Sequence, residues 1–353
     1  MLPVLERELS ASGGQTKSSP TPWFFLERPA LFNDEPFSDG DWERHHSWLR
    51  HLPEPAVFVQ VAKSLFPLVL WSMVVSVAVG LYAQLLQPKQ GWPVAVSQDY
   101  LVPFTLTSFA ISLLLVFRTN SSYNGWWEAR KAFGRMYNNV RIIARLSGCW
   151  IGKTQPGIAA DVIRYTSVLC AAACAFLRQD CEGFLSMYAG TVLTQSEYAF
   201  ITEHKQPPMA VMQLISILLK ESELTVYERC EMERQLEQFD ISIGACERIR
   251  GQPIPLAYTR HNSRLIISFI TWLPFALWAY AEWLTIPIMA ALTFLLVGIE
   301  NIGIQIEQPI MVLPLKSLSN SCQRAVEAIA DSQEWATTVV SGKVAIVTLD
   351  SRQ

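Results

Sequence analysis

The side chains of one uncharged stretch are more typical of an ion path than of a catalytic site. The stretch is YLVPFTLTSFAISLLLVF, at residues 100–117. Pro103 stands where a proline favours the first helical position. The helix would then start with Pro103, Phe104 and Thr105. Free backbone N–H groups and the positive end of the helix dipole attract anions there. We therefore expect an anion-attracting helix terminus at these three residues.

A bulky apolar stripe follows on the same helix. Phe109, Leu113 and Phe117 recur at every fourth position, which places them on one face. Such a stripe could line an ion path, with Thr and Ser hydroxyls nearby. It could also simply pack against another helix, and the residue types alone favour this simpler interpretation.

No catalytic set accompanies this stretch. The sequence has no G-x-S-x-G, no H-E-x-x-H and no complete P-loop. Three of the five histidines, His45, His46 and His51, cluster in a polar, Arg-bearing segment. An interfacial polar helix explains them better than a metal site does. We expect no enzyme activity, no metal and no cofactor.

Composition places these residues in a membrane protein. Hydrophobic residues make up 50% of the 353 and charged residues only 17%, against about 25% in soluble chains. The mean hydropathy is +0.21. The net charge of −3 gives no basic field for nucleic acid. Seven cysteines without a C-x-x-C pair are interpreted as free thiols in apolar surroundings.

Four stretches are apolar enough to cross a bilayer as helices of about 20 residues. They are Ser64–Leu86, Tyr100–Phe117, Leu265–Ala281 and Trp283–Ile299, the last two forming a hairpin that turns near Glu282–Pro287. The connection between the first two holds only Lys89, whereas the opposite flanks are rich in Arg and Lys. The positive-inside rule then places both termini and the long central segment on the inner side.

The central segment is predicted to be helical, without strands or repeats. Its expected helices are Ser122–Trp150 continuing the second membrane helix, Asp161–Leu185, Pro207–Lys220 and Val226–Arg250. The chain then divides into a partly disordered tail at 1–40, an interfacial helix and the first two membrane helices at 41–118, an inner domain at 119–262, two membrane helices at 263–308, and a C-terminal segment at 309–353. No targeting peptide is visible in the first residues.

Four motifs resemble those of bestrophins and occur in that family's order. They are FRTNSSYNGWWEARK at 117–131, GACERI with the following PIPLAYTR at 244–260, LPFALW at 273–278 and GIENIGIQIEQP at 298–309. The first departs at Gly125, where many members place Arg. The run DWERHHSWLRHL at 41–52 is similar to the pre-membrane segment of plant and algal plastid bestrophin-like proteins, which are thylakoid anion channels.

The resemblance implies an all-α membrane protein, with four transmembrane helices per subunit and a helical inner-side domain, assembled as a homopentamer around one pore. Phe109, Leu113 and Phe117 match the three rings of the family's pore neck, where a dry constriction gates by dewetting. Ungapped counting back from the second motif places an inner aperture at Tyr227, with Arg229 beside it to attract anions.

Animal bestrophins carry an Asp-rich run after the fourth helix that clasps calcium. The corresponding segment here is QPIMVLP at 308–314, without a carboxylate cluster. Because calcium needs several oxygen ligands, we expect an opening that does not depend on it.

The function implied is a passive channel for chloride and other monovalent anions such as nitrate, with voltage dependence implied by the plastid relatives. Its partners would be the anion, further copies of the chain and the lipid bilayer. The alternatives are a bicarbonate channel, a secondary anion transporter and a membrane-embedded regulatory protein. A transporter predicts broken helices or intramembrane charges, and only Glu282 lies among the apolar stretches. The implied compartment is the thylakoid, with a plasma membrane or bacterial inner membrane as alternatives.

Overall fold

The computed structural model describes residues 55–86, 101–252 and 254–350, and within them the chain is helical. Only one isolated bridge, between Ala189 and Leu193, interrupts the helical pattern of these residues. The predictions for the N-terminal tail, for the segment around His45, His46 and His51, and for Lys89 lie outside the described residues.

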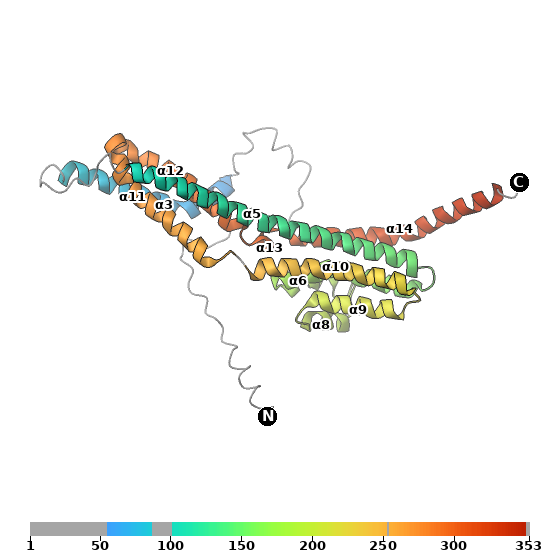
Figure 1. Cartoon of the computed structure of the whole chain (residues 1–353). Helices are drawn as coiled ribbons and strands as arrows, with labels where there is room; N and C mark the ends of the chain where they lie inside the picture. The colour runs from blue at the N-terminus through green and yellow to red at the C-terminus, as the bar shows by residue number, and fades with distance from the viewer. Residues whose placement is uncertain (1–54, 87–100, 253, 351–353) are drawn as a thin grey trace, which may run out of the picture.

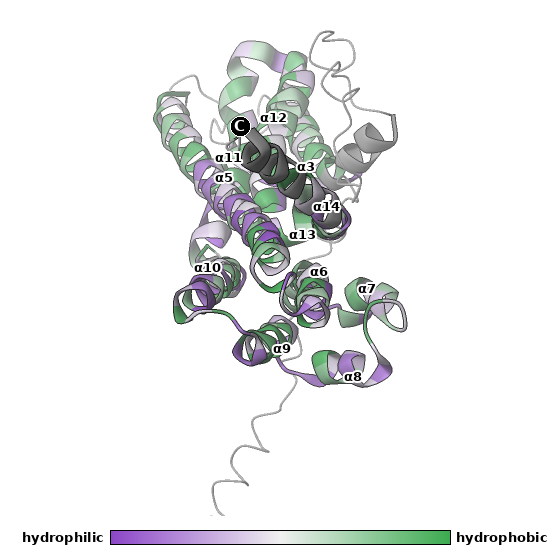
Figure 2. Cartoon of the chain, turned by 90° about the vertical axis from the view of Figure 1, so that its right-hand side faces the viewer, coloured by the Kyte–Doolittle hydropathy of each residue, from purple (hydrophilic) through white to green (hydrophobic). Residues whose placement is uncertain are grey.

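A membrane bundle forms one end of the molecule (Figure 1). It contains α3 (Pro55–Leu81, with a π-helical turn at Tyr82–Leu86), the first part of α5 (Leu101–Leu146), α11 (Leu256–Ala281) and α12 (Thr285–Ile306). A short 3₁₀ turn, Glu282–Leu284, joins α11 to α12. Figure 2 shows the residues of these helices mostly in the green of hydrophobic side chains. The four predicted membrane helices are confirmed as long, apolar helices.

The inner domain forms the other end. Its helices are α6 (Pro156–Arg178), α7 (Cys181–Leu185), α8 (Gln195–Glu203), α9 (Pro207–Glu221), α10 (Val226–Gly251), α13 (Pro309–Val312) and α14 (Leu315–Asp350). Helix α6 is apolar enough to cross a bilayer, but 72% of its most apolar window is buried inside the chain. It packs against α5, α9 and α14. We therefore assign α6 to the core of the inner domain.

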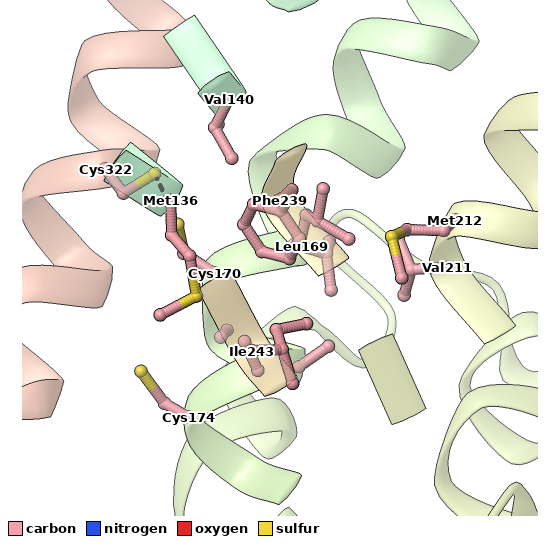
Figure 3. Close-up of a cluster of buried hydrophobic side chains, with 14 of the residues drawn as sticks. Met136, Val140, Leu169, Cys170, Cys174, Val211, Met212, Phe239, Ile243 and Cys322 are labelled. Atoms are coloured by element: carbon pink, nitrogen blue, oxygen red, sulfur yellow. Dashed lines mark hydrogen bonds between the residues drawn. The ribbon is translucent and has the colours of Figure 1, made fainter. Parts of the chain in front are cut away.

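Cysteines contribute to that core (Figure 3). All seven are free thiols, and Cys170, Cys174, Cys246 and Cys322 are buried. Burial raises the pKa of Cys246 to about 12. This confirms apolar packing for four of the cysteines. Of the remainder, Cys149 and Cys230 are exposed instead.

Helix α5 joins the two ends. Its 46 residues extend, with a π-helical turn at Ser147–Ile151, from the membrane bundle through the whole inner domain. At 1.5 Å per residue the helix is about 69 Å long. Helix α10 returns along its second half, and α14 packs against it too. The predicted continuation of the second membrane helix into the inner domain is confirmed.

Three predictions about helices were wrong or incomplete. The expected single helix Asp161–Leu185 is two helices, because Gln179 adopts a left-handed conformation (φ 57°) and Asp180 caps α7. Helix α5 begins at Leu101 among the described residues, so Pro103 is its third residue rather than its first. The C-terminal segment forms the long helix α14, which the sequence pattern did not predict.

Candidate pore-lining site

Helix α5 has two different faces in its membrane part. Ile111 and Leu115 are 3% and 4% exposed and pack in the bundle core. On the other side Phe109, Leu113 and Phe117 are 74%, 44% and 55% exposed. No other described helix of the same chain covers this stripe. The simpler interpretation, in which the stripe packs within the chain, is therefore excluded for the described residues.

The hydroxyl groups near the stripe already donate hydrogen bonds within α5. The side chain of Thr105 donates to the carbonyl of Leu101 (2.9 Å), and Thr107 donates to Pro103 (2.7 Å). Ser112 donates in the same way to Ser108 (2.8 Å). An anion needs donors, so these hydroxyls offer little to it in this conformation. The stripe is thus an apolar face without strong binding groups.

The three residues predicted to attract anions lie in the first turns of α5, but they point differently. Phe104 faces the bundle and makes an edge-on contact with Phe269 of α11, with ring centroids 5.8 Å apart. Pro103 and Thr105 are exposed. Only the backbone N–H groups and the helix dipole remain there as attractive features.

A buried ion cluster lies directly beside the stripe, and sequence reasoning missed it. Arg118 is 1% exposed and forms ion pairs with Glu300 on α12 and, at 3.4 Å, with Glu307, the residue that directly follows α12. Ser263 of α11 donates a hydrogen bond to Glu300 (3.0 Å). The cluster therefore joins three membrane helices at one level.

The expectation that only Glu282 lies among the apolar stretches was wrong. Helix α12 continues to Ile306 and so includes Glu300, which is 5% exposed. The seven-residue spacing of Glu300 and Glu307, two turns on one helix face, was the available signal.

The predicted inner aperture residues lie far from the stripe. Tyr227 is the second residue of α10 and is 81% exposed, whereas Arg229 is half-buried. Helix α10 begins at the end of the inner domain farthest from the membrane bundle (Figure 1). The backbone N–H of Glu223, just before α10, donates to Gln155, which follows the end of α5 (2.8 Å). The structure does not bring Tyr227 and the stripe together but places them at opposite ends of α5.

The sequence profile described as "Bacterial/Fungal Bestrophin protein" matches residues 42–328. The chain belongs to the bestrophin family. A crystallised mutant of a bacterial bestrophin homolog from Klebsiella pneumoniae has the same fold. Its TM-score is 0.68 at 21% identity, over 75% of this chain and 98% of that one.

Relatives of this bestrophin-family chain carry channel names. A voltage-dependent anion channel-forming protein of Synechocystis is 30% identical over 67% of this chain and 79% of its own length. The chloroplastic voltage-dependent chloride channel 1 of Arabidopsis thaliana is 27% identical over 87% of this chain and 76% of its own. The chain is thus a membrane protein of an anion-channel family, with relatives in chloroplasts and bacteria.

The segment that corresponds to the calcium-binding run of animal bestrophins differs in its residue types. Residues 308–314 contain no carboxylate. The carbonyl oxygens of Ile310 and Leu313 instead accept hydrogen bonds from Arg178 of α6 (3.4 and 2.8 Å). These two carbonyl oxygens already accept from the positively charged Arg178 guanidinium. They are therefore poor ligands for a calcium ion.

Proposed function

We propose that this chain is the pore-forming subunit of a passive channel for chloride and other monovalent anions. Five copies would surround one pore, and opening would respond to voltage and need no calcium. The observation that carries this proposal is the apolar stripe Phe109, Leu113 and Phe117, which is exposed on a membrane helix and which no described helix of its own chain covers. Equivalent helices around a symmetry axis would turn five such stripes toward one another.

Such a neck would pass anions without binding them tightly. A ring of Phe and Leu side chains makes a dry constriction that opens and closes by wetting. The edges of aromatic rings are weakly positive, so inward-turned edges ease a partly dehydrated anion through. The internally bonded hydroxyls of Thr107 and Ser112 leave no strong site to trap the ion.

The inner domain would extend the path beyond the membrane. Tyr227, exposed at the far end of α10, would form a second constriction with its copies, and Arg229 would raise the local anion concentration there. From Phe117 to the end of α5 at Leu146 the axial length is about 40 Å. The two constrictions would therefore act on an ion one after the other.

A secondary anion transporter is the second candidate, because the cluster of Arg118, Glu300 and Glu307 is of the kind that forms coupling sites. However, transporter sites are typically built from broken helices. Helix α5 runs unbroken past the cluster, α12 is unbroken up to its end at Ile306, and the Arg118 charge is already paired.

The compartment and the ion are proposed from the relatives. The Arabidopsis relatives named chloroplastic chloride channels favour a thylakoid membrane and chloride. The Synechocystis relative fits a bacterial membrane equally well. Because the neck has no ion-specific ligand, nitrate and bicarbonate are expected to compete with chloride for passage.

Planar-bilayer recording of the purified chain under a chloride gradient tests the proposal. The test variant replaces Phe109, Leu113 and Phe117 together by Ala. A matched control replaces Phe66, Leu70 and Val74 of α3, which have the same spacing and are also exposed. Test and control variants therefore each change three exposed apolar residues on one membrane helix, and neither changes the charge.

We expect a reversal potential near the chloride equilibrium value, altered conductance or gating in the α5 variant, and unchanged currents in the α3 control. A reversal potential that follows a second, coupled ion would favour the transporter. Currents that are indifferent to the α5 substitutions would remove the stripe from the pore.

A further inference from the structure

Arg118 is the most deeply buried charged side chain of the membrane bundle among the described residues. It is 1% exposed, and its guanidinium contacts Glu300 of α12 and Glu307 at the C-terminal cap of that helix. Charge-assisted hydrogen bonds of this kind are strong and directional. Because Glu300 lies within α12 and Glu307 caps its C-terminal end, the guanidinium is held from two positions about two turns apart.

Arg118 also follows Phe117, the innermost residue of the stripe. Consecutive helical residues point about 100° apart, and here Phe117 is exposed while Arg118 is buried. The direction of one side chain therefore sets the direction of the other. A rotation of α5 that broke the ion pairs would turn Phe117 away from its present face.

Apolar contacts alone would fix this rotation poorly. Lipid tails are as apolar as the helix surface, so membrane helices gain no hydrophobic force for one rotational setting. Ile111 and Leu115 pack without directional bonds. The polar cluster favours one rotational setting of α5, because a buried Arg that loses its carboxylate partners is strongly disfavoured.

We propose that Arg118 is a positioning residue of the neck: its buried ion pairs with Glu300 and Glu307 set the rotation of α5, so that Phe117 faces the pore axis. This rests on the proposed channel function, which assigns Phe117 to the neck. Arg118 itself does not contact the permeating anion. It acts through the helix that it shares with Phe117.

Thiol labelling measures the rotation without relying on conduction. Phe117→Cys and Val116→Cys are introduced separately into the full chain, reconstituted in liposomes. Each is labelled with a charged methanethiosulfonate, and mass spectrometry follows the peptide that carries the new thiol. The ratio of the two labelling rates reports which way α5 is turned, and native thiols are read on other peptides.

The ratio is measured in backgrounds that weaken the cluster by steps. Glu307→Gln leaves the Arg118–Glu300 pair, Arg118→Lys keeps the charge but loses the planar fork, and Arg118→Gln removes the charge. Gly303→Ala is the matched control. A Cβ there would meet Arg118 and Thr119 no closer than 3.8 Å, which is ordinary contact. Size-exclusion chromatography confirms assembly of each variant.

We expect the ratio to change several-fold in Arg118→Gln, less in Glu307→Gln and Arg118→Lys, and not at all in Gly303→Ala. Relative permeability to small and large anions should shift in the same order. A purely stabilising role would lower the melting temperature and leave the ratio unchanged, which would overturn the proposal.

The experiment also gives a clear answer if one variant fails to assemble or if the unsubstituted chain does not conduct. If Arg118→Gln does not assemble, the ratio in Glu307→Gln and Arg118→Lys supports or overturns the positioning role. If the unsubstituted chain passes no anion while the ratio still shifts, the channel function falls and the rotational role of Arg118 stands.

Discussion

The carboxylate of Glu197, outside the membrane bundle, accepts four hydrogen bonds. Arg164 donates to both of its oxygens (2.9 and 3.0 Å), and Tyr165 and the backbone of Thr194 donate as well. The Arg164 hydrogen bonds are the main reason that the pKa of Glu197 falls from 4.5 to about 2. The same bonds attach α8 to α6.

Glu197→Gln should therefore destabilise the inner domain in a pH-dependent way. The lowered pKa means that the stabilisation is fully present above about pH 4.5 and is lost as the pH falls toward 2. We expect a loss of about 1–2 kcal/mol at pH 7, allowing for screening at this partly exposed site. Thermal unfolding in detergent at several pH values measures it. Glu231, which is half-buried and paired with the exposed Arg234, supplies the control variant.

Glu231→Gln should have a much smaller effect, because water screens that pair. A gap between Glu197→Gln and the unsubstituted chain that stays constant from pH 6 to pH 3 would contradict the pKa assignment.

Gly80 permits a close approach between α3 and α11. A Cβ at this position would lie 2.4 Å from the ring of Trp278, which is itself 6% exposed. We expect Gly80→Ala to separate the helices and to cost about 1–3 kcal/mol, the usual range for overpacking. The melting temperature of the purified chain measures this. Gly125→Ala is the control, since nothing lies within 4 Å of its Cβ. Equal melting temperatures for the two variants would contradict the close packing.

At the scale of elements, Arg178 attaches the connection between the membrane bundle and α14. Its guanidinium reaches from α6 to the carbonyls of Ile310 and Leu313, on either side of the end of α13. The ring of Phe184 lies against the same guanidinium, at 5.7 Å. Helix α13 also buries Pro309 and Ile310, and it packs against α5, α6 and α12.

Arg178→Gln should release α13 and the start of α14. Hydrogen bonds from charged donors contribute about 1.5–3 kcal/mol, so amide hydrogen exchange over residues 309–320 should become faster by one to two orders of magnitude. Mass-spectrometric hydrogen exchange measures it. Lys316→Gln, which removes the other cation near Phe184 at 5.9 Å, is the control. Unchanged exchange in Arg178→Gln would show that packing alone holds α13.

The sequence predicts elements well where hydropathy or helix caps mark them. The apolar runs of the membrane helices and the Thr-initiated helix α10 are of this kind, and α10 has the capping box that its first turn suggests. Prediction from the sequence fails where tertiary contacts decide whether a helix forms or where it ends. Helix α14 has a polar, mixed pattern and forms against α5 and α6. The break at Gln179 needs a left-handed residue that is not glycine.

The candidate site likewise has a part that the sequence pattern marks and a part that only tertiary contacts decide. The stripe Phe109, Leu113 and Phe117 is readable because four-residue spacing fixes a helix face. That none of the described helices covers the stripe depends on how the whole bundle is arranged. Arg118 resembles an ordinary basic residue that flanks a membrane helix, and its burial depends on α12 carrying Glu300 to the same level.

For the whole molecule, one rigid helix connects everything that the proposed pore requires. Helix α5 carries the stripe in the membrane, the ion cluster beside it and the wall of the inner domain on which α10 and α14 pack. A change at either end is therefore transmitted along a single element. The chain also passes between the two ends from α10 to α11 and from α12 through α13 to α14, and Arg178 donates a hydrogen bond to the second of these segments.

This arrangement predicts channel activity that is independent of calcium. Calcium takes six to eight oxygen ligands, whereas residues 308–314 offer no carboxylate and two of their carbonyls already face the Arg178 guanidinium. Among the residues that the structure describes, no cluster of three or more acidic, His or Cys side chains could hold a metal ion. Bilayer currents should therefore be the same with excess chelator and with micromolar calcium, because the internal cation already fixes the connection. Currents that appear only after calcium is added would contradict this, and would place the activating site on residues outside those described or between subunits.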